Sequence, residues 1–228
     1  MIPTPGAALL FDIDGTLADT DPLHLEAFNR SFAPFGHSFD RARFVRELQG
    51  LANVDIAARF LPDLDADARM AVMDDKEALF RELAATEIHA VAGLFNLLDQ
   101  ADAAGIAMAA VTNAPRANAE LILHGLGITS RFKAVVIGAE LPHGKPHPMP
   151  YLEGLRLLGA QAEHSLAFED SRTGIASATA AGIATIGMRT GLDDAALRVA
   201  GAVLSADGYD DPALLAFVAD RVSASQIA

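Results

Sequence analysis

A short acidic sequence, Asp12-Ile13-Asp14-Gly15-Thr16, follows the first apolar run of the chain. In an extended backbone, side chains two positions apart point the same way, so Asp12 and Asp14 face one site. Gly15 permits a sharp turn there. A simple turn cluster explains this sequence about equally well, because Asp and Gly are common in turns. An EF-hand calcium loop is excluded, since it requires glycine at its sixth position and Gly15 is fourth from Asp12.

Two further polar sequences could hold a phosphate. Thr112 and Asn113 end a second apolar run, where the Thr112 hydroxyl and backbone N–H groups could bind phosphate oxygens and Asn113 could contact the substrate. Both residues could equally cap the next helix. Lys145 stands between Gly144 and Pro146 in the proline-rich loop 142–150. It could bring positive charge to a phosphate and to a carboxylate nucleophile, although a lone lysine in a loop is more often solvated.

Glu169 and Asp170 leave another apolar run. Two carboxylates at the end of a buried strand need a partner, because desolvated charge is costly. A divalent cation shared with Asp12 would provide one, and Mg²⁺ suits a site of oxygen ligands with few carboxylates. The alternative is that Glu169 or Asp170 caps a helix that begins near Thr173.

The elements that must position these residues follow from the hydrophobic pattern. Short apolar runs at 7–11, 107–111, 134–137, 166–168 and 183–186 predict buried strands, and helix-like segments separate them. Alternation of strands and helices predicts an α/β fold, a Rossmann-like doubly wound parallel sheet with helices on both faces. The four polar sequences then all lie at the carboxyl ends of strands, where open α/β sheets bind ligands.

The segment 20–88 interrupts this alternation with helical patterns and no convincing strand. Leu25, Phe28, Phe32 and Phe35 are spaced to share one helical face, and seven of the twelve Phe residues fall in this segment. Asp21 before Pro22 is typical of a helix N-cap with proline at the first helical position. We therefore predict an α/β core formed by 1–19 and 89–228, with 20–88 as a helical insert that can bury a small core of its own.

Composition limits the possible functions. The chain of 228 residues has 30 acidic and 17 basic residues, a formal net charge of −13, which argues against a general nucleic-acid binder because such a protein needs a basic face. The absence of cysteine excludes thiolate nucleophiles and Cys-ligated zinc. The N-terminus has no basic stretch before its apolar run, and no apolar run approaches the ~18 residues that span a bilayer. We expect a cytoplasmic protein without a membrane partner.

The ordered polar sequences resemble the four motifs of the haloacid dehalogenase superfamily, and the resemblance covers nearly the whole chain, including the position of the insert. In detail, the chain is similar to the branch that contains phosphoglycolate phosphatase-like enzymes, sugar-phosphate phosphatases and β-phosphoglucomutase. The motif residues are Asp12, Asp14, Gly15, Thr16, Thr112, Lys145, Glu169 and Asp170.

This resemblance implies a role for each motif residue. Asp12 is the nucleophile that forms an aspartyl phosphate, and Asp14 is the general acid and base. Thr112 and Lys145 hold the transferring phosphoryl group. An anionic nucleophile that approaches an anionic phosphate needs positive charge between them, which Mg²⁺ and Lys145 supply. Crowding among the carboxylates is expected to keep Asp14 available as an acid.

The resemblance also implies a metal site and a cap. Mg²⁺ is bound by Asp12, the backbone carbonyl of Asp14 and Asp170, and Glu169 helps at that site. The insert resembles the helical cap that closes over the site and reads the substrate.

Two cap residues, His24 and Lys76, lie near positions that contact substrate in the mutase, so we expect both to bind substrate. Asn53 stands where an arginine is expected after Gly50.

The sequence is compatible with three functions: a phosphatase acting on a small, sugar-type phosphate ester, a phosphosugar mutase of the same fold, and a non-catalytic binding protein. The complete set of catalytic residue types favours an enzyme, and the absence of the arginine favours water as the acceptor of the phosphoryl group. Spacing in the sequence reveals neither the identity of the ester nor the oligomeric state.

Overall fold

Six parallel strands form one sheet, in the order β3-β2-β1-β4-β5-β6, in the computed structural model, which describes residues 4–222. Each of the five neighbouring pairs is parallel. The strands are β1 (Ala8–Phe11), β2 (Ala107–Thr112), β3 (Ala134–Ile137), β4 (Leu166–Glu169), β5 (Ala184–Met188) and β6 (Leu204–Ala206).

The central position of β1 determines where a ligand can bind. The chain runs from β1 outward through β2 to β3, then returns to the other side of β1 to form β4. Open α/β sheets bind ligands at such a switch point, beyond the carboxyl ends of the strands. Register places Phe11 of β1 beside Ala110 of β2 and Phe168 of β4, so the residues that follow Phe11 and Phe168 emerge side by side.

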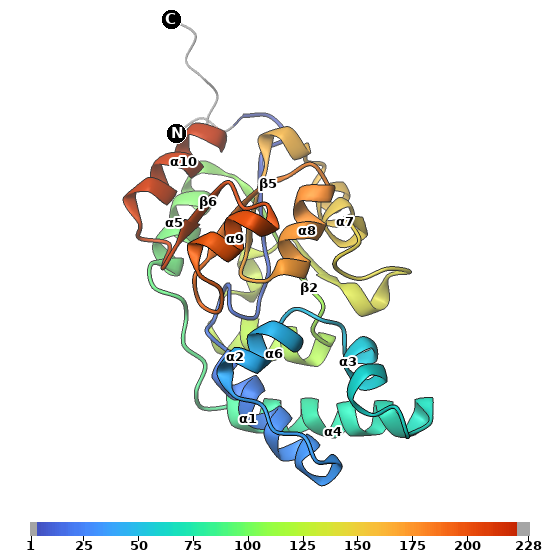
Figure 1. The fold of residues 1–228 in the computed structure, drawn as a ribbon. Helices are drawn as coiled ribbons and strands as arrows, with labels where there is room; N and C mark the ends of the chain where they lie inside the picture. The colour runs from blue at the N-terminus through green and yellow to red at the C-terminus, as the bar shows by residue number, and fades with distance from the viewer. Residues whose placement is uncertain (1–3, 223–228) are drawn as a thin grey trace, which may run out of the picture.

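Helices cover both faces of the sheet (Figure 1). Leu9 and Phe11 pack in a cluster with residues of α5, α6 and α10, whereas Ala8 and Leu10 pack with residues of α7 and α8 on the opposite face. This alternation along β1 is the two-residue period of a strand that is buried on both sides. The helices of this part are α5 (Leu94–Ala104), α6 (Arg116–Gly125), α7 (Met149–Leu158), α8 (Arg172–Ala180), α9 (Asp194–Ala200) and α10 (Pro212–Val222).

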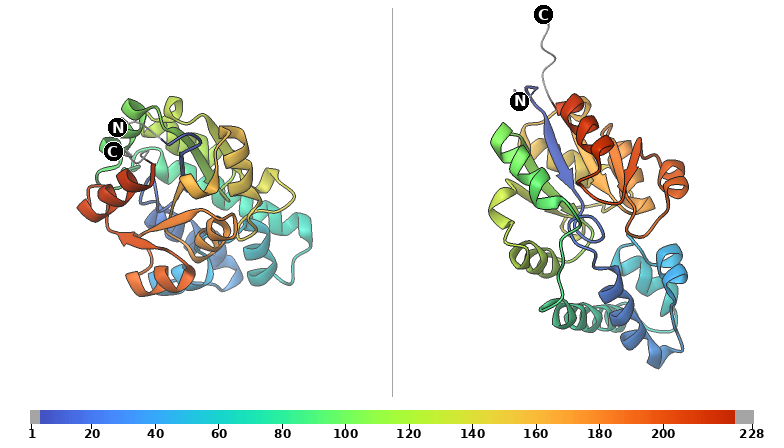
Figure 2. Two further views of the ribbon diagram at one scale, coloured as in Figure 1. Left: turned by 90° about the horizontal axis from the view of Figure 1, so that it is seen from above. Right: turned by 90° about the vertical axis from the view of Figure 1, so that its left-hand side faces the viewer.

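Four of the five α-helices between β1 and β2 gather at one end of the sheet, as the right-hand view of Figure 2 shows. They are α1 (Asp21–Phe32), α2 (Arg41–Glu47), α3 (Asn53–Phe60) and α4 (Ala66–Ala84). The carboxylates of Asp40 and Asp65 accept hydrogen bonds from the first turns of α2 and α4, which fixes where these helices begin. The four helices enclose an apolar cluster of their own, which includes Phe28, Phe32 and Phe44.

Two connecting segments join these helices to the sheet, and the two segments lie next to each other. Ala18 forms an antiparallel bridge with Ala90, and the Val91 N–H donates to the Leu17 carbonyl at 3.0 Å. Because both connections pass through one point, the helices are joined to the sheet at a single paired crossing.

The predicted fold class is confirmed, and each of the five expected strands is present. The short β6 was missed, because three residues give too little periodicity to recognise. Phe35 was wrongly placed on the face of α1: this helix ends at Phe32, and Phe35 is 39% exposed. Among the described residues, no helix is long and apolar enough to cross a membrane.

Candidate active site

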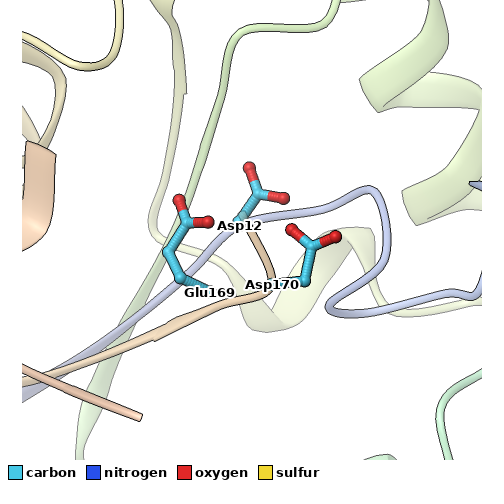
Figure 3. Close-up of side chains that lie close together, drawn as sticks. All are labelled: Asp12, Glu169 and Asp170. Atoms are coloured by element: carbon cyan, nitrogen blue, oxygen red, sulfur yellow. The ribbon is translucent and has the colours of Figure 1, made fainter. Parts of the chain in front are cut away.

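Three carboxylates converge at the switch point. Asp12 directly follows β1, Glu169 is the last residue of β4, and Asp170 comes next. One oxygen from each lies within 4.8 Å of the others, and all three side chains are buried. Figure 3 shows the three carboxylates next to one another at the ends of their strands. The sequence therefore places three acidic groups in one small volume, where they repel one another unless a cation is present.

Lys145 supplies positive charge to this cluster. Its Nζ donates to Asp12 Oδ1 at 2.5 Å, to Glu169 Oε1 at 2.6 Å and to the Val111 carbonyl at 2.7 Å. The side chain is 3% exposed. Burial disfavours its charged form, but the carboxylates of Asp12 and Glu169 outweigh burial and raise its pKa above the ordinary value. Lys145 is thus a fixed cation, and not the solvated loop lysine of the alternative interpretation.

Asn113 holds the Lys145 loop in place. Its Oδ1 accepts from the Lys145 backbone N–H at 2.9 Å, and its Nδ2 donates to the Lys145 carbonyl at 3.0 Å. Thr112 is buried at the end of β2, and its Oγ1 accepts from the Ala114 N–H at 2.9 Å. Neither residue caps α6, whose N-cap position is occupied by Pro115. Thr112 and Asn113 both line the cleft at this site.

Glu169 is held by neutral donors as well as by Lys145. The Tyr151 hydroxyl donates to its Oε1 at 2.7 Å, and the Ser171 hydroxyl donates to its Oε2 at 3.2 Å. Gly174 leaves room for this carboxylate, since a Cβ there would lie 1.9 Å from Glu169 Oε1. The cap of α8 is Ser171, which accepts from the Gly174 N–H. The alternative in which Glu169 or Asp170 caps this helix is therefore excluded.

Asp14 has different surroundings from Asp12. Its Oδ1 accepts from Thr20 Oγ1 at 2.7 Å and lies 3.1 Å from His24 Nε2. Burial acts to raise the pKa of Asp14, but the bonds from His24 and Thr20 outweigh it and lower the pKa below its ordinary value. Our expectation that crowding keeps Asp14 protonated was wrong, because its nearest partners are donors and not other carboxylates.

Crowding acts instead on Asp12 and Asp170. Burial raises the pKa of Asp12 well above its ordinary value, and Glu169 and Asp14 add to the rise while Lys145 opposes it. Burial also raises the pKa of Asp170, with the charges of Asp21 and Asp12 adding to it. Burial is therefore the main cause that disfavours ionisation of Asp12 and Asp170, and the neighbouring carboxylates add to it.

These residues fit a divalent cation. Asp12, Glu169 and Asp170 offer oxygen atoms from three buried carboxylates within one ligand sphere, and hard cations such as Mg²⁺ prefer oxygen ligands. Gly15 allows the backbone after Asp14 to approach this cluster. It has φ +71°, and a Cβ at this position would lie 2.2 Å from Asp170 Oδ2.

The α2–α3 loop covers the cluster from the side of the helices. Gln49 Nε2 donates to Asp170 Oδ2 at 2.7 Å and to Asp21 Oδ2 at 3.1 Å. The Gly50 carbonyl accepts from Thr173 Oγ1 at 2.9 Å. Asp21 is the first residue of α1 and not its N-cap, which corrects our prediction: Thr20 precedes the helix, while Asp21 is buried beneath Gln49. Burial, helped by the charge of Asp19, raises the pKa of Asp21 to about 7.

His24 and Lys76 also line the cleft. Lys76 Nζ lies 2.9 Å from His24 Nδ1 and 3.0 Å from Glu77 Oε1, and the His24 ring stacks on Phe80 at 3.8 Å. Since the lysine ammonium only donates, His24 Nδ1 accepts and Nε2–H donates to Asp14. Asn53 donates to Glu77 Oε1 at 2.8 Å.

All the predicted site residues except Glu169 line one cleft, whose empty volume is about 630 Å³, part of it open to solvent. The predicted residues that line it are Asp12, Asp14, His24, Lys76, Thr112, Asn113, Lys145 and Asp170. Sequence reasoning missed Gln49, Glu77, Tyr151 and Ser171. Only Gln49 had a local signal in the sequence, because it precedes a glycine, Gly50. In the structure Gly50 has φ +74° and forms a tight turn toward the site.

Comparison with known proteins agrees with this geometry. The family model described as haloacid dehalogenase-like hydrolase matches residues 9–188. Protein CbbY of Rhodobacter capsulatus is 33% identical over 189 residues, 78% of this chain and 83% of that protein. A phosphorylated carbohydrates phosphatase of Thermotoga maritima is 32% identical over 203 residues, 86% of this chain and 92% of that protein.

Solved structures of related proteins also resemble this chain. The crystal structure of a CbbY variant from Rhodobacter sphaeroides in complex with xylulose-(1,5)bisphosphate superposes with a TM-score of 0.78 at 30% identity, covering 92% of this chain and 96% of that one. This chain belongs to the haloacid dehalogenase-like hydrolase family, as its ordered motifs predict. The prediction of a phosphoric monoester hydrolase is confirmed by the family and by the relatives that are named phosphatases.

Proposed function

We propose that the protein is a Mg²⁺-dependent phosphatase that hydrolyses a small, sugar-type phosphate monoester through an aspartyl phosphate on Asp12. The observation that supports this most directly is the placement of Asp12 Oδ1, which lies 2.5 Å from Lys145 Nζ and beside Glu169 and Asp170 at the switch point of the sheet. A carboxylate in this position can approach an anionic phosphate, because fixed positive charge lies next to it.

Asp12 and Asp170, together with the backbone carbonyl of Asp14, would hold the Mg²⁺, with Glu169 beside it. When bound, the cation neutralises charge on the phosphate oxygens and on the attacking carboxylate. Glu169 also orients Lys145, through the bond at 2.6 Å. Lys145 and Thr112 line the cleft next to Asp12 and would bind the oxygens of the phosphoryl group that is transferred.

The reaction has two halves. In the first, a carboxylate oxygen of Asp12 forms a bond to phosphorus, the bond from phosphorus to the ester oxygen breaks, and Asp14 gives a proton to the departing oxygen. In the second, Asp14 takes a proton from water, the water oxygen bonds to phosphorus, and the Asp12–phosphorus bond breaks. The bonds from Thr20 and His24 to Asp14 favour its carboxylate form, which suits the second half.

The helical segment 20–88 would act as a cap over this chemistry, joined to the core 1–19 and 89–228. In support, Gln49 and Gly50 contact residues of the sheet end, and the two connections cross at Ala18 and Ala90. Cap residues also form one wall of the cleft, so their side chains would select the part of the substrate beyond the phosphate. His24 and Lys76 belong to this wall.

The substrate class is supported by the relatives. One is named a phosphatase of phosphorylated carbohydrates, and the solved CbbY variant holds a sugar bisphosphate. The acidic chain, with a net charge of −13, makes a nucleic acid a poor partner. The cleft beside Asp12 is lined by both polar and apolar side chains, which suits a small phosphorylated metabolite.

A phosphate-release assay tests the proposal. The purified protein is given p-nitrophenyl phosphate, sugar phosphates, phosphoglycolate and nucleotides, with Mg²⁺ or with EDTA. We expect inorganic phosphate from at least one ester with Mg²⁺, none in EDTA, and recovery when Mg²⁺ is restored. Full activity in EDTA would contradict the metal assignment, and release from no ester at all would favour a binding protein.

The same assay distinguishes a phosphatase from a mutase. The protein is incubated with β-glucose 1-phosphate, Mg²⁺ and a trace of the 1,6-bisphosphate. We expect water to be the acceptor, so that phosphate accumulates from a member of the panel. Rapid formation of glucose 6-phosphate, with negligible phosphate release from any ester, would show that the protein is a mutase.

A further inference from the structure

The part of the cleft lined by α4 carries a fixed negative charge, on Glu77. This side chain lies on α4, lines the cleft and is 4% exposed. Its Oε1 accepts from Asn53 at 2.8 Å and from Lys76 at 3.0 Å, and its Oε2 accepts from Asn118 Nδ2 at 2.6 Å. Three donors, one of them an ammonium, stabilise the ionised carboxylate, because a carboxylate only accepts.

The nearest cation, Lys76, is already paired. It is 2% exposed, bonds to Glu77 and His24, and lies 4.1 Å from the centre of the Phe28 ring. Of the described residues that line the cleft, only Lys76 and Lys145 carry fixed positive charge, against five acidic side chains. Lys145 is occupied with Asp12 and Glu169. A second phosphate in this cleft would therefore meet no cation that lacks a carboxylate partner.

The arginines of the nearby α2 do not change this balance. Arg43 donates to Glu47 and to the Ser38 carbonyl, and Arg46 donates to Glu47. Neither arginine lines the cleft. Asn53, at the position where the motif pattern suggested an arginine, uses its amide to hold Glu77 in place.

We propose that Glu77 restricts the substrate to esters with a single phosphate, whose remaining part is a neutral polyol or sugar. A hydroxyl group can donate to the Glu77 carboxylate, whereas a second phosphate only accepts and is repelled by it. Phe28, Leu48 and Ile56, which belong to one apolar cluster, also line the cleft and would pack against the carbon chain. This inference rests on the proposed phosphatase function and names the substrate class for that site.

Matched esters test it. The value of kcat/KM for phosphate release is measured for fructose 1-phosphate, fructose 6-phosphate and fructose 1,6-bisphosphate, with free Mg²⁺ held constant because bisphosphates bind the ion. We expect the bisphosphate to be at least about tenfold poorer than the better monophosphate, which corresponds to ~1.4 kcal/mol. Equal or faster release from the bisphosphate would overturn the inference while leaving the phosphatase function intact.

Variants then assign the selection to Glu77. Glu77→Gln removes the charge but keeps the size, and we expect the ratio of bisphosphate to monophosphate kcat/KM to rise at least about fivefold. Because Lys76 would lose its buried partner, folding is checked by circular dichroism. Asn53→Arg, which adds a positive charge without removing Glu77, is the second variant, with Asn53→Gln as its neutral control.

We expect Asn53→Arg to raise the same ratio and Asn53→Gln to leave it near the wild-type value. An unchanged ratio in folded Glu77→Gln, or in Asn53→Arg if the first variant does not fold, would overturn the role of Glu77. Failure to release phosphate from any ester, p-nitrophenyl phosphate included, would instead refute the phosphatase function, and the inference would fall with it.

Discussion

Gln49 Nε2 lies 2.7 Å from Asp170 Oδ2, a contact between residues 121 positions apart in the chain. It connects the α2–α3 loop directly to the carboxylate cluster, and a second bond at 3.1 Å connects the same amide to Asp21. The position of the α2–α3 loop and the geometry of the carboxylate cluster are thus connected through the side chain of Gln49.

Loss of this amide should weaken catalysis without unfolding the protein. We expect Gln49→Ala to lower kcat/KM for p-nitrophenyl phosphate by about 5- to 30-fold, the factor that corresponds to ~1–2 kcal/mol. Gln49→Glu should be worse, because a carboxylate would face Asp170 and Asp21. Steady-state kinetics at saturating Mg²⁺ measure both, and a Gln49→Glu variant as active as the wild type would contradict the coupling.

Asp14 should act on the departing oxygen and on water. We expect Asp14→Asn to slow hydrolysis of a sugar phosphate by roughly 10²–10⁴-fold, the usual scale of general acid–base catalysis. The loss should be smaller with p-nitrophenyl phosphate, because p-nitrophenolate leaves without protonation. Comparing kcat/KM of the variant on both esters measures this difference, and equal losses would count against the acid role.

Gly15 should be required for the geometry of the site. Gly15→Ala places a Cβ 2.2 Å from Asp170 Oδ2, at a residue with φ +71°, and misplacement by about 1 Å can cost 10²-fold in rate. Gly36→Ala is the matched control, since Gly36 has φ +79° and open space around its missing Cβ.

Both glycine variants should lose stability, by about 1–2 kcal/mol from backbone strain, while only Gly15→Ala should lose activity. Thermal unfolding and kcat of the two variants separate the effects. A fully active Gly15→Ala enzyme would show that the close approach to Asp170 is not needed.

The sheet and the carboxylate cluster could be predicted because both depend on local sequence. Buried strands are visible in the sequence as short apolar runs. Because the carboxyl ends of parallel strands meet at one edge of the sheet, the topology alone brings Asp12, Thr112 and Glu169 together. Lys145 required the motif pattern, since nothing in its loop indicates that its ammonium reaches Asp12, 133 positions away.

The resemblance pointed to His24 and Lys76, but the pairing that buries Lys76 and Glu77 in the cleft could not be predicted, for a physical reason. Glu77 and Asn118 are 41 residues apart and meet only because α4 packs against α6. The helical period shows which face of α4 is buried, but Lys76 and Glu77 look like solvent-exposed charges in such a pattern. Their burial depends on mutual pairing across elements, and that pairing leaves no local trace.

The proposed mechanism depends most directly on the transfer of a phosphoryl group to Asp12. The enzyme is mixed with substrate and Mg²⁺, quenched in acid within one turnover, and digested, and the peptides are weighed by mass spectrometry. We expect one phosphoryl group on the peptide that contains Asp12, and none in Asp12→Asn, which should fold normally but release no phosphate because a neutral amide cannot form the acyl phosphate. A phosphoryl group on another residue, or more than a trace of turnover by Asp12→Asn, would contradict it.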